Sequence, residues 1–110
     1  MSRAKGNFAE TKAKVFLQNL GFEIIDTNFY AKKLGEIDII ATKNDVYHFC
    51  EVKSANDYDT AISNLTTSKL EKIKRSALYY LQNKNLDTVF CIDAIIVTND
   101  KIDFLENISF

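Results

Sequence analysis

Two apolar segments of the chain carry charged side chains where a buried strand would have none. The first segment, 35–41, has Asp38 near its centre, and the second, 46–54, contains Glu51 and Lys53. Strands inside a core avoid charge unless the charged group is paired, bound to a metal or used in chemistry. We therefore expect a fold that brings these three side chains together, and they are the strongest functional signal in the sequence.

The residues between the two segments predict how the strands face each other. Residues 42–45 form a turn, and Asn44 followed by Asp45 suits a two-residue hairpin loop. If these two residues are the centre of the loop, Asp38 lies directly opposite Glu51. Opposed residues in a sheet have Cβ atoms about 4.5–5.5 Å apart, so the two carboxylates repel unless one is protonated or neutralised.

A divalent cation would relieve this repulsion, because Mg²⁺ binds a few carboxylate oxygens together with water. Lys53 shares a strand face with Glu51, since side chains alternate along a strand. An ammonium group there can orient water or stabilise charge on a phosphate. Two acids and a lysine in this order are typical of a phosphodiesterase site with Mg²⁺ or Mn²⁺ as cofactor. The alternative is an ion pair at a sheet edge.

The remaining periodicity predicts an α/β sandwich around one mixed central sheet flanked by helices, in the order αβββαβ with a last short strand. The expected helices cover 7–20, stopped by Gly21, and a second stretch that opens with a capping box at Ser68 to Glu71. The core face of this second helix is expected to be Leu70, Ile73, Ala77, Tyr80 and Leu81. The other expected strands are 22–28, 89–97 and 101–105, with polar connections at 28–34 and 55–67.

Glu10 lies beside the apolar stripe of the first helix, one turn from Ala13. A carboxylate at the edge of the core could provide a third ligand for the cation. The alternative is an acid near a helix N-terminus, where the helix dipole favours negative charge.

Size and composition predict a single cytoplasmic domain, 1–110. The chain is 46% hydrophobic, and it contains neither a run of 18 apolar residues nor a signal-peptide core. Cys50 and Cys91 fall in apolar segments and are expected to be buried thiols without a disulfide. No four metal ligands occur at the sequence spacing of a zinc site.

The basic residues are clustered although the net charge of −1 argues against bulk coating of nucleic acid. Such clustering permits a basic face, and the alternative is a set of solvated helix surfaces. The three basic stretches are Arg3, Lys5, Lys12 and Lys14; Lys32 and Lys33; and Lys69, Lys72, Lys74 and Arg75.

Three further polar residues fall in or beside the predicted strands. His48 lies on the face opposite Glu51 and is expected to make a local hydrogen bond; the alternative is that it is a ligand. Asp93 stands in an apolar run and needs partners, either as a structural residue or in support of the site. Glu36 either supports the site or flanks the hairpin.

The order of these motifs resembles a known family. Glu51-Val52-Lys53 after Asp38 resembles the D…(D/E)-x-K signature of restriction-endonuclease-like nucleases, and the chain as a whole resembles the YraN-like family of small bacterial proteins. The matching positions are Gly6-Asn7-Phe8-Ala9-Glu10, Ala13, Leu17, Gly21-Phe22, Asn28, Gly35-Glu36-Ile37-Asp38, Phe49-Cys50-Glu51-Val52-Lys53, Lys69, Ala77, Tyr80-Leu81 and Asp93.

The resemblance implies a restriction-endonuclease-like fold, similar to that of archaeal Holliday-junction resolvases, with a metal-dependent nuclease site. By this resemblance Glu10, Asp38 and Glu51 are metal ligands, and Lys53 is the catalytic lysine. Lys69 would contact phosphate, and we expect three further lysines on the same nucleic-acid-binding face: Lys12, Lys32 and Lys33.

The chain departs from the family pattern at three places. Ser54-Ala55 and Cys91 stand where the family usually has arginine, which removes two phosphate-binding groups. Ile37 stands where the wider nuclease signature has proline.

Two functions are compatible with this sequence. The first is a Mg²⁺-dependent endonuclease-like protein that acts on branched or structured DNA, as a homodimer by analogy with the resolvases. The alternative, favoured by the missing arginines and the net charge, is a non-catalytic nucleic-acid-binding or scaffold protein on a nuclease fold.

Overall fold

The computed structural model describes residues 3–108, and side chains from residue 8 onward. The side chains of Arg3 and Lys5, in the first basic stretch, lie outside the described residues. Helix α1 spans Arg3–Asn19 and begins earlier than the sequence predicts. It buries Ala9, Ala13 and Leu17, which recur every four residues along one face.

Helix α1 ends in a Schellman motif, as the glycine after it predicts. Gly21 has a φ of 94°, the N–H of Gly21 donates to the Gln18 carbonyl, and the N–H of Phe22 donates to the Leu17 carbonyl. Phe22 is buried directly after this turn. The helix end therefore fixes the point at which the chain enters the sheet.

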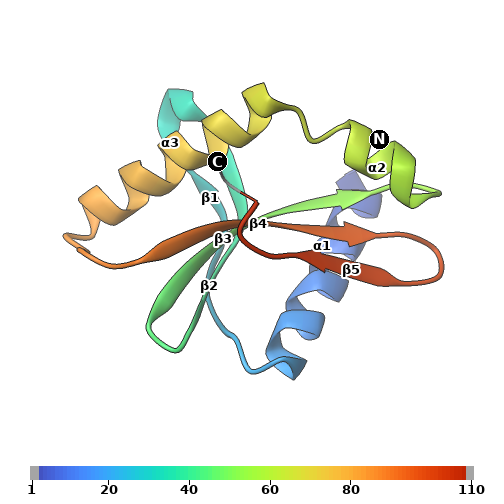
Figure 1. Ribbon diagram of the computed structural model, residues 1–110, viewed down its shortest axis with the longest axis horizontal. Coiled ribbons are helices and arrows are strands. Elements are labelled where there is room, and N and C mark those ends of the chain that lie inside the picture. Colours follow the sequence, from blue (N-terminus) through green and yellow to red (C-terminus); the bar gives the residue numbers. More distant parts are fainter. Residues whose placement is uncertain (1–2, 109–110) are drawn as a thin grey trace.

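Five strands form one mixed sheet in the order β1-β2-β3-β4-β5. Neighbouring strands are antiparallel except β3 and β4, which run parallel. The helices lie on both faces, so the expected mixed sheet flanked by helices is confirmed (Figure 1). The strands are β1 Glu23–Tyr30, β2 Glu36–Lys43, β3 Val46–Ser54, β4 Phe90–Val97 and β5 Ile102–Leu105.

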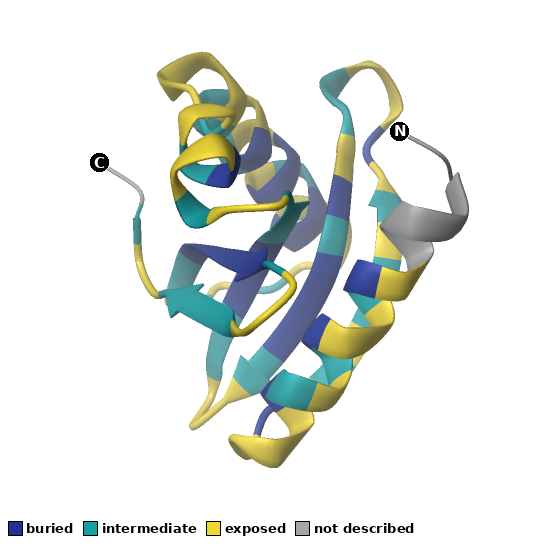
Figure 2. Cartoon of the chain, turned by 90° about the vertical axis from the view of Figure 1, so that its right-hand side faces the viewer, coloured by how far each residue is buried: buried dark blue, intermediate teal, exposed yellow. Residues whose placement is uncertain are grey.

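The core lies in two layers, one on each side of the sheet (Figure 2). On one side α1 packs on Ile39, Cys50 and Ile95. On the other side helix α3, Thr67–Asn83, packs on Ile40 and Phe49. The residues of α3 that are buried are Ile73, Ser76, Ala77, Tyr80 and Leu81. Four of the five core positions expected for this helix are thus confirmed as buried, and Leu70 is half-buried at the edge of the same cluster.

The β2–β3 hairpin has the two-residue loop that its sequence predicts. Lys43 pairs with Val46, and both loop residues have positive φ, 53° at Asn44 and 65° at Asp45. Such a loop matches the twist of the flanking strands. The paired register runs from this loop to Ile39 opposite Cys50.

Local side-chain caps change two boundaries expected from the sequence. The polar stretch 55–67 is not all loop, because it contains helix α2, Tyr58–Ser63, where the Asp57 side chain accepts from the Thr60 N–H. The prediction of a capping box that opens at Ser68 is wrong. The N-cap is Thr66, whose hydroxyl accepts from the Lys69 N–H at 3.2 Å, so the N-cap lies two residues before the expected one.

The connection between β1 and β2 is shorter than expected. Strand β1 continues to Tyr30, and a single 3₁₀ turn, η1 Lys32–Leu34, leads to Gly35, whose φ is 120°. Pairing of Phe29 with Ile37 and Tyr30 with Glu36 extends the strand into the stretch 28–34, which was expected to be a polar connection. Among the helices of residues 3–108, none combines the length and hydrophobicity needed to cross a bilayer.

Candidate functional site

Asp38 lies on β2 at the point where the ladder to β3 ends. Its Oδ2 accepts a 2.8 Å hydrogen bond from the Val52 N–H. A side-chain oxygen here serves as the acceptor for a backbone donor of the neighbouring strand. The carboxylate is thereby held between the strands, beside Glu51, as the hairpin register predicts.

Burial, together with the nearby carboxylates, makes the charged form of Asp38 costly. Burial is the largest cause that raises the pKa of Asp38, followed by the charge of Glu51 and, more weakly, that of Glu10; the Val52 hydrogen bond acts in the opposite direction. The result is a pKa of about 8 instead of the usual 3.8. At neutral pH this carboxyl therefore holds a proton unless a cation is close by.

Glu10 reaches the same region from α1. Its Oε1 accepts from Asn28 Nδ2 at 3.0 Å, and its charge acts on Asp38. The helix dipole favours acids in the first turn of a helix. Because α1 begins at Arg3, Glu10 lies beyond that first turn. The alternative of an N-terminal acid is therefore wrong, and the charge of Glu10 contributes, more weakly than that of Glu51, to the raised pKa of Asp38.

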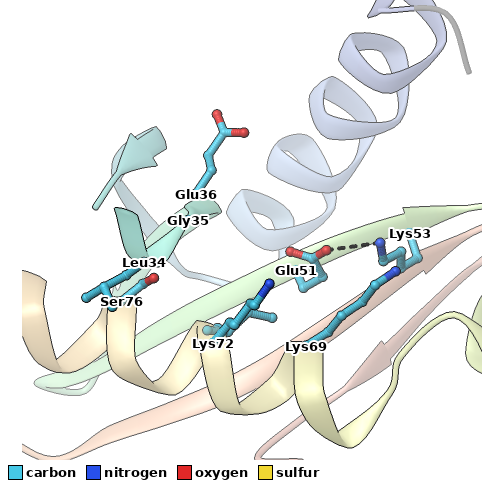
Figure 3. Close-up of a pocket in the computed structure, with 9 residues that line it drawn as sticks. Leu34, Gly35, Glu36, Glu51, Lys53, Lys69, Lys72 and Ser76 are labelled. Atoms are coloured by element: carbon cyan, nitrogen blue, oxygen red, sulfur yellow. Dashed lines mark ion pairs between the residues drawn. The ribbon is translucent and has the colours of Figure 1, made fainter. Parts of the chain in front are cut away.

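Lys53 forms an ion pair with Glu51, with 3.2 Å between Nζ and Oε2. Both side chains line a pocket of about 220 Å³ between β3 and α3. In Figure 3, Lys72 extends from α3 toward Glu51 and Lys69 extends toward Lys53, whereas the carboxylate of Glu36 points away from them. The full lining is Leu34, Gly35, Glu36, Glu51, Lys53, Lys69, Lys72, Ile73 and Ser76.

Sequence reasoning missed Lys72 and Ser76 as members of this pocket. They follow Lys69 by three and seven residues, which places all three on one face of α3. That spacing was the available signal. It could not be used from the sequence alone, because the face of α3 that lines the pocket depends on how the helix docks on the sheet.

The other lysines expected to bind nucleic acid do not line this pocket. Lys12 is exposed on α1 and lies over the Phe8 ring, 4.5 Å from its centroid. Lys32 and Lys33 are exposed in η1. Only Lys69 of the four expected residues is part of the pocket wall.

His48 and Asp93 form a buried pair on the other side of β3. The distance between His48 Nδ1 and Asp93 Oδ2 is 2.6 Å, and Asp93 Oδ1 accepts from the Asn107 N–H at 2.7 Å. The partner of His48 is thus 45 residues away, and the expectation of a local hydrogen bond is wrong. The Asp93 carboxylate therefore has two hydrogen-bond partners, the ring of His48 and the N–H of Asn107.

Both cysteines are free, as expected. Cys50 is buried, but Cys91 is only half-buried. Burial raises the pKa of the Cys50 thiol well above its usual range, and burial also raises the pKa of Cys91; in both cases the charge of Asp93 adds to the effect. In the metal-free protein both thiols are therefore protonated at neutral pH.

The fold and this site define a small mixed α/β domain with a carboxylate pair and a lysine-lined pocket beside it. The chain belongs to the Uncharacterised protein family UPF0102, whose family model matches residues 9–97. This bears out the expected YraN-like family.

Close relatives match over almost the whole chain. A UPF0102 protein of Aliarcobacter butzleri is 62% identical over 109 residues, 99% of each chain. A UPF0102 protein of Wolinella succinogenes is 51% identical over 109 residues, again 99% of each chain. A UPF0102 protein of Helicobacter pylori strain HPAG1 is 51% identical over 108 residues, 98% of this chain and 93% of the relative.

Proposed function

We propose that this protein is a Mg²⁺-dependent, endonuclease-like enzyme with a restriction-endonuclease-like fold, which hydrolyses phosphodiester bonds in branched or structured DNA. The observation that carries the proposal is the Asp38 carboxyl group, held at the end of the β2–β3 ladder with Glu51 and Glu10 close by. A DNA substrate agrees with the cytoplasmic location expected from the sequence.

The residues at this position fit a hard divalent cation. Mg²⁺ and Mn²⁺ prefer carboxylate oxygens, and the repulsion that raises the Asp38 pKa to about 8 is what a cation would offset. Asp38 and Glu51 would hold the ion, and Glu10 would assist from α1. When bound, the ion would supply Lewis-acid polarisation of the phosphate and of the attacking water.

The chain's own side chains would position the phosphate. Lys53 lies 3.2 Å from Glu51 and lines the pocket, so its ammonium group stands where it can orient water or stabilise charge on a phosphate. Lys69 and Lys72 form the opposite wall on α3. Three lysines around one pocket give a local positive charge that the net charge of −1 conceals.

Cleavage of a four-way DNA junction tests the proposal. With Mg²⁺ or Mn²⁺ present, the purified protein is expected to cut the junction, and Lys53→Ala is expected to cut about 100-fold more slowly or not at all. Lys101→Ala is the matched control, because Lys101 is an exposed lysine in an ion pair with Asp103. Cleavage by Lys53→Ala at the wild-type rate would exclude the mechanism.

A second function, a non-catalytic nucleic-acid-binding or scaffold protein, is favoured by the absence of arginine at 54, 55 and 91. Calorimetric titration with Mg²⁺ and Mn²⁺, combined with junction binding at several salt concentrations, separates the two functions. Junction binding that falls with salt, without ion uptake or cleavage, would support the scaffold. Failure to bind both the ion and the junction would argue for a protein partner.

A further inference from the structure

Four potential metal-binding side chains lie together on the face of the sheet that α1 covers. His48 and Cys50 alternate along β3, and in the parallel register they stand beside Cys91 and Asp93 of β4. Registered neighbours in parallel strands point to the same face. More than forty residues separate the two pairs in sequence, so no spacing motif reveals the group.

The group is compact. Within the described part of the chain, His48, Cys91 and Asp93 form the one set of three such residues whose ligand atoms all lie within 4.8 Å of one another. The closest contact is the 2.6 Å pair of His48 Nδ1 and Asp93 Oδ2. Cys50 Sγ lies 3.8 Å from the same Asp93 oxygen.

These donors differ in kind from the acids around Asp38. Nitrogen, sulfur and oxygen donors in one set are typical of zinc, whereas Mg²⁺ favours oxygen alone. Bonds of about 2.0–2.3 Å place the donor atoms of a tetrahedral zinc site about 3.3–3.8 Å apart. His48 and Asp93 would have to separate by less than 1 Å from their 2.6 Å contact, and Cys91 would have to rotate toward them.

The surroundings already orient the two buried ligands. Asp93 is held by the Asn107 N–H, and the His48 ring packs edge-on against Phe22, with 4.9 Å between ring centroids. His48 and Asp93 are 4% and 0% exposed, while Cys91 is half-buried and leaves an approach from solvent. Fixed ligands with supporting contacts are what a metal site requires.

We propose that His48, Cys91 and Asp93 form a binding site for a thiophilic divalent cation of the zinc type, with Cys50 or water as the fourth ligand. The cation would replace the proton between His48 and Asp93 and the thiol proton of Cys91. The site is separate from the Asp38 carboxylates in both donor type and sheet position.

Cobalt substitution tests this proposal. Adding Co²⁺ to the reduced, chelator-treated protein is expected to produce the near-ultraviolet charge-transfer band of a cobalt thiolate and the intense visible bands of tetrahedral cobalt. Added Zn²⁺ is expected to bleach both. Cys91→Ser should lose the Cys91 part of the thiolate band, so that any band that remains is that of Cys50, and it should bind Zn²⁺ at least about tenfold more weakly, while its circular dichroism stays that of the wild type.

Glu51→Gln is the control, because it alters the carboxylate pair and leaves this set of ligands intact; its cobalt thiolate band should equal that of the wild type. Zinc should also protect Cys91 from alkylation, as measured by mass spectrometry of the modified peptides. Absence of a thiolate band at saturating Co²⁺ would overturn the proposal. So would an unchanged band in Cys91→Ser, since the sulfur ligand would then not be Cys91.

Discussion

The N–H of Val52 donates to the Asp38 carboxylate, 2.8 Å away, beyond the last paired residues of β2 and β3. A backbone donor of one strand is thus satisfied by a side chain of the next, and Asp38 is held in place before any ligand arrives. This hydrogen bond favours the charged form, but burial and Glu51 outweigh it. The carboxyl group is therefore fixed in position and, among residues 3–108, lacks a positive charge that would offset its own.

Asp38→Asn is expected to stabilise the metal-free protein at pH 7 to 8. The native pKa of Asp38 is about 8 and its usual value is 3.8, so between these pH values the native state holds a proton that the unfolded state has lost. The contribution of that proton to the free energy of unfolding is fully present below pH 4 and is lost as the pH rises through 8. Asn keeps the acceptor for Val52 without the charge. Urea unfolding should show a gain of more than about 1 kcal/mol at pH 8 and a much smaller difference at pH 4; equal stabilities at both pH values would contradict this reasoning.

Glu51→Gln should lower the pKa of Asp38. The charge of Glu51 is the second cause of the rise after burial, so its removal leaves the burial effect and takes away the largest charge repulsion. A carbon-detected NMR titration of the Asp38 carboxyl should place its midpoint below the wild-type value of about 8. Glu36→Gln serves as the comparison, because Glu36 is not among the groups that act on Asp38. A midpoint that stays the same in Glu51→Gln would show that the two carboxyls do not interact.

Binding of Mn²⁺ should release a proton at pH 7. Asp38, with its pKa near 8, is mostly protonated there, and a cation at the pair requires the charged form. Calorimetric titrations in buffers of different ionisation enthalpy measure the number of protons released. The release should disappear in Asp38→Asn, and the wild-type affinity should increase from pH 6 to pH 8. Tight binding without proton release would place the ion elsewhere.

Lys69→Ala and Lys72→Ala should each weaken DNA binding without changing which DNA structure is preferred. Both side chains line the pocket and point toward the ion pair of Glu51 and Lys53, where they would contact phosphate. Each lost contact should reduce the slope of log affinity against log salt by about 1. Fluorescence anisotropy at several salt concentrations gives this slope, and Lys101→Ala, at an exposed lysine outside the pocket, should leave it unchanged. A slope that is unaltered in both pocket variants would remove these lysines from the interface.

Gly21→Ala should destabilise the protein by about 1–2 kcal/mol. Gly21 has a φ of 94° at the end of α1, a conformation that is costly for residues with a Cβ. Space is not the difficulty, because the nearest atom that a Cβ would meet is Cε of Lys43 at 3.7 Å. Chemical denaturation measures the loss. Asn19→Ala, two residues earlier at an exposed helical position, is the control and should change stability by less than about 0.5 kcal/mol.

The strands and the hairpin loop could be predicted from the sequence because their signals are local. The loop residues Asn44 and Asp45 determine the register, and the apolar run of β4 identifies a central strand. Helix α2 and the N-cap Thr66 were missed because several polar residues in that stretch are equally good caps, and sequence alone does not say which one finds its backbone donor.

The residues of the candidate site also divide into those that local sequence signals could predict and those that they could not. Asp38 and Glu51 belong to one hairpin, so counting residues across the loop was enough to bring them together. The pair of His48 and Asp93 depends on the parallel register of β3 and β4, which becomes known only once the path of the crossover through α2 and α3 is known. Ser76 was missed for a related reason, since its position on the pocket wall depends on how α3 docks.

The parallel pairing of β3 with β4 also has a consequence for the order of assembly. The hairpin closes over two loop residues, whereas His48 meets Asp93 only after a segment of more than forty residues has folded back. Closing a longer loop costs more entropy. Asp38 and Glu51 can therefore come together when β2 and β3 pair, whereas His48 and Asp93 meet only after the crossover through α2 and α3 has folded. A chain interrupted between β3 and α3 would keep Asp38 opposite Glu51 and would lose both the lysine wall and the partner of His48.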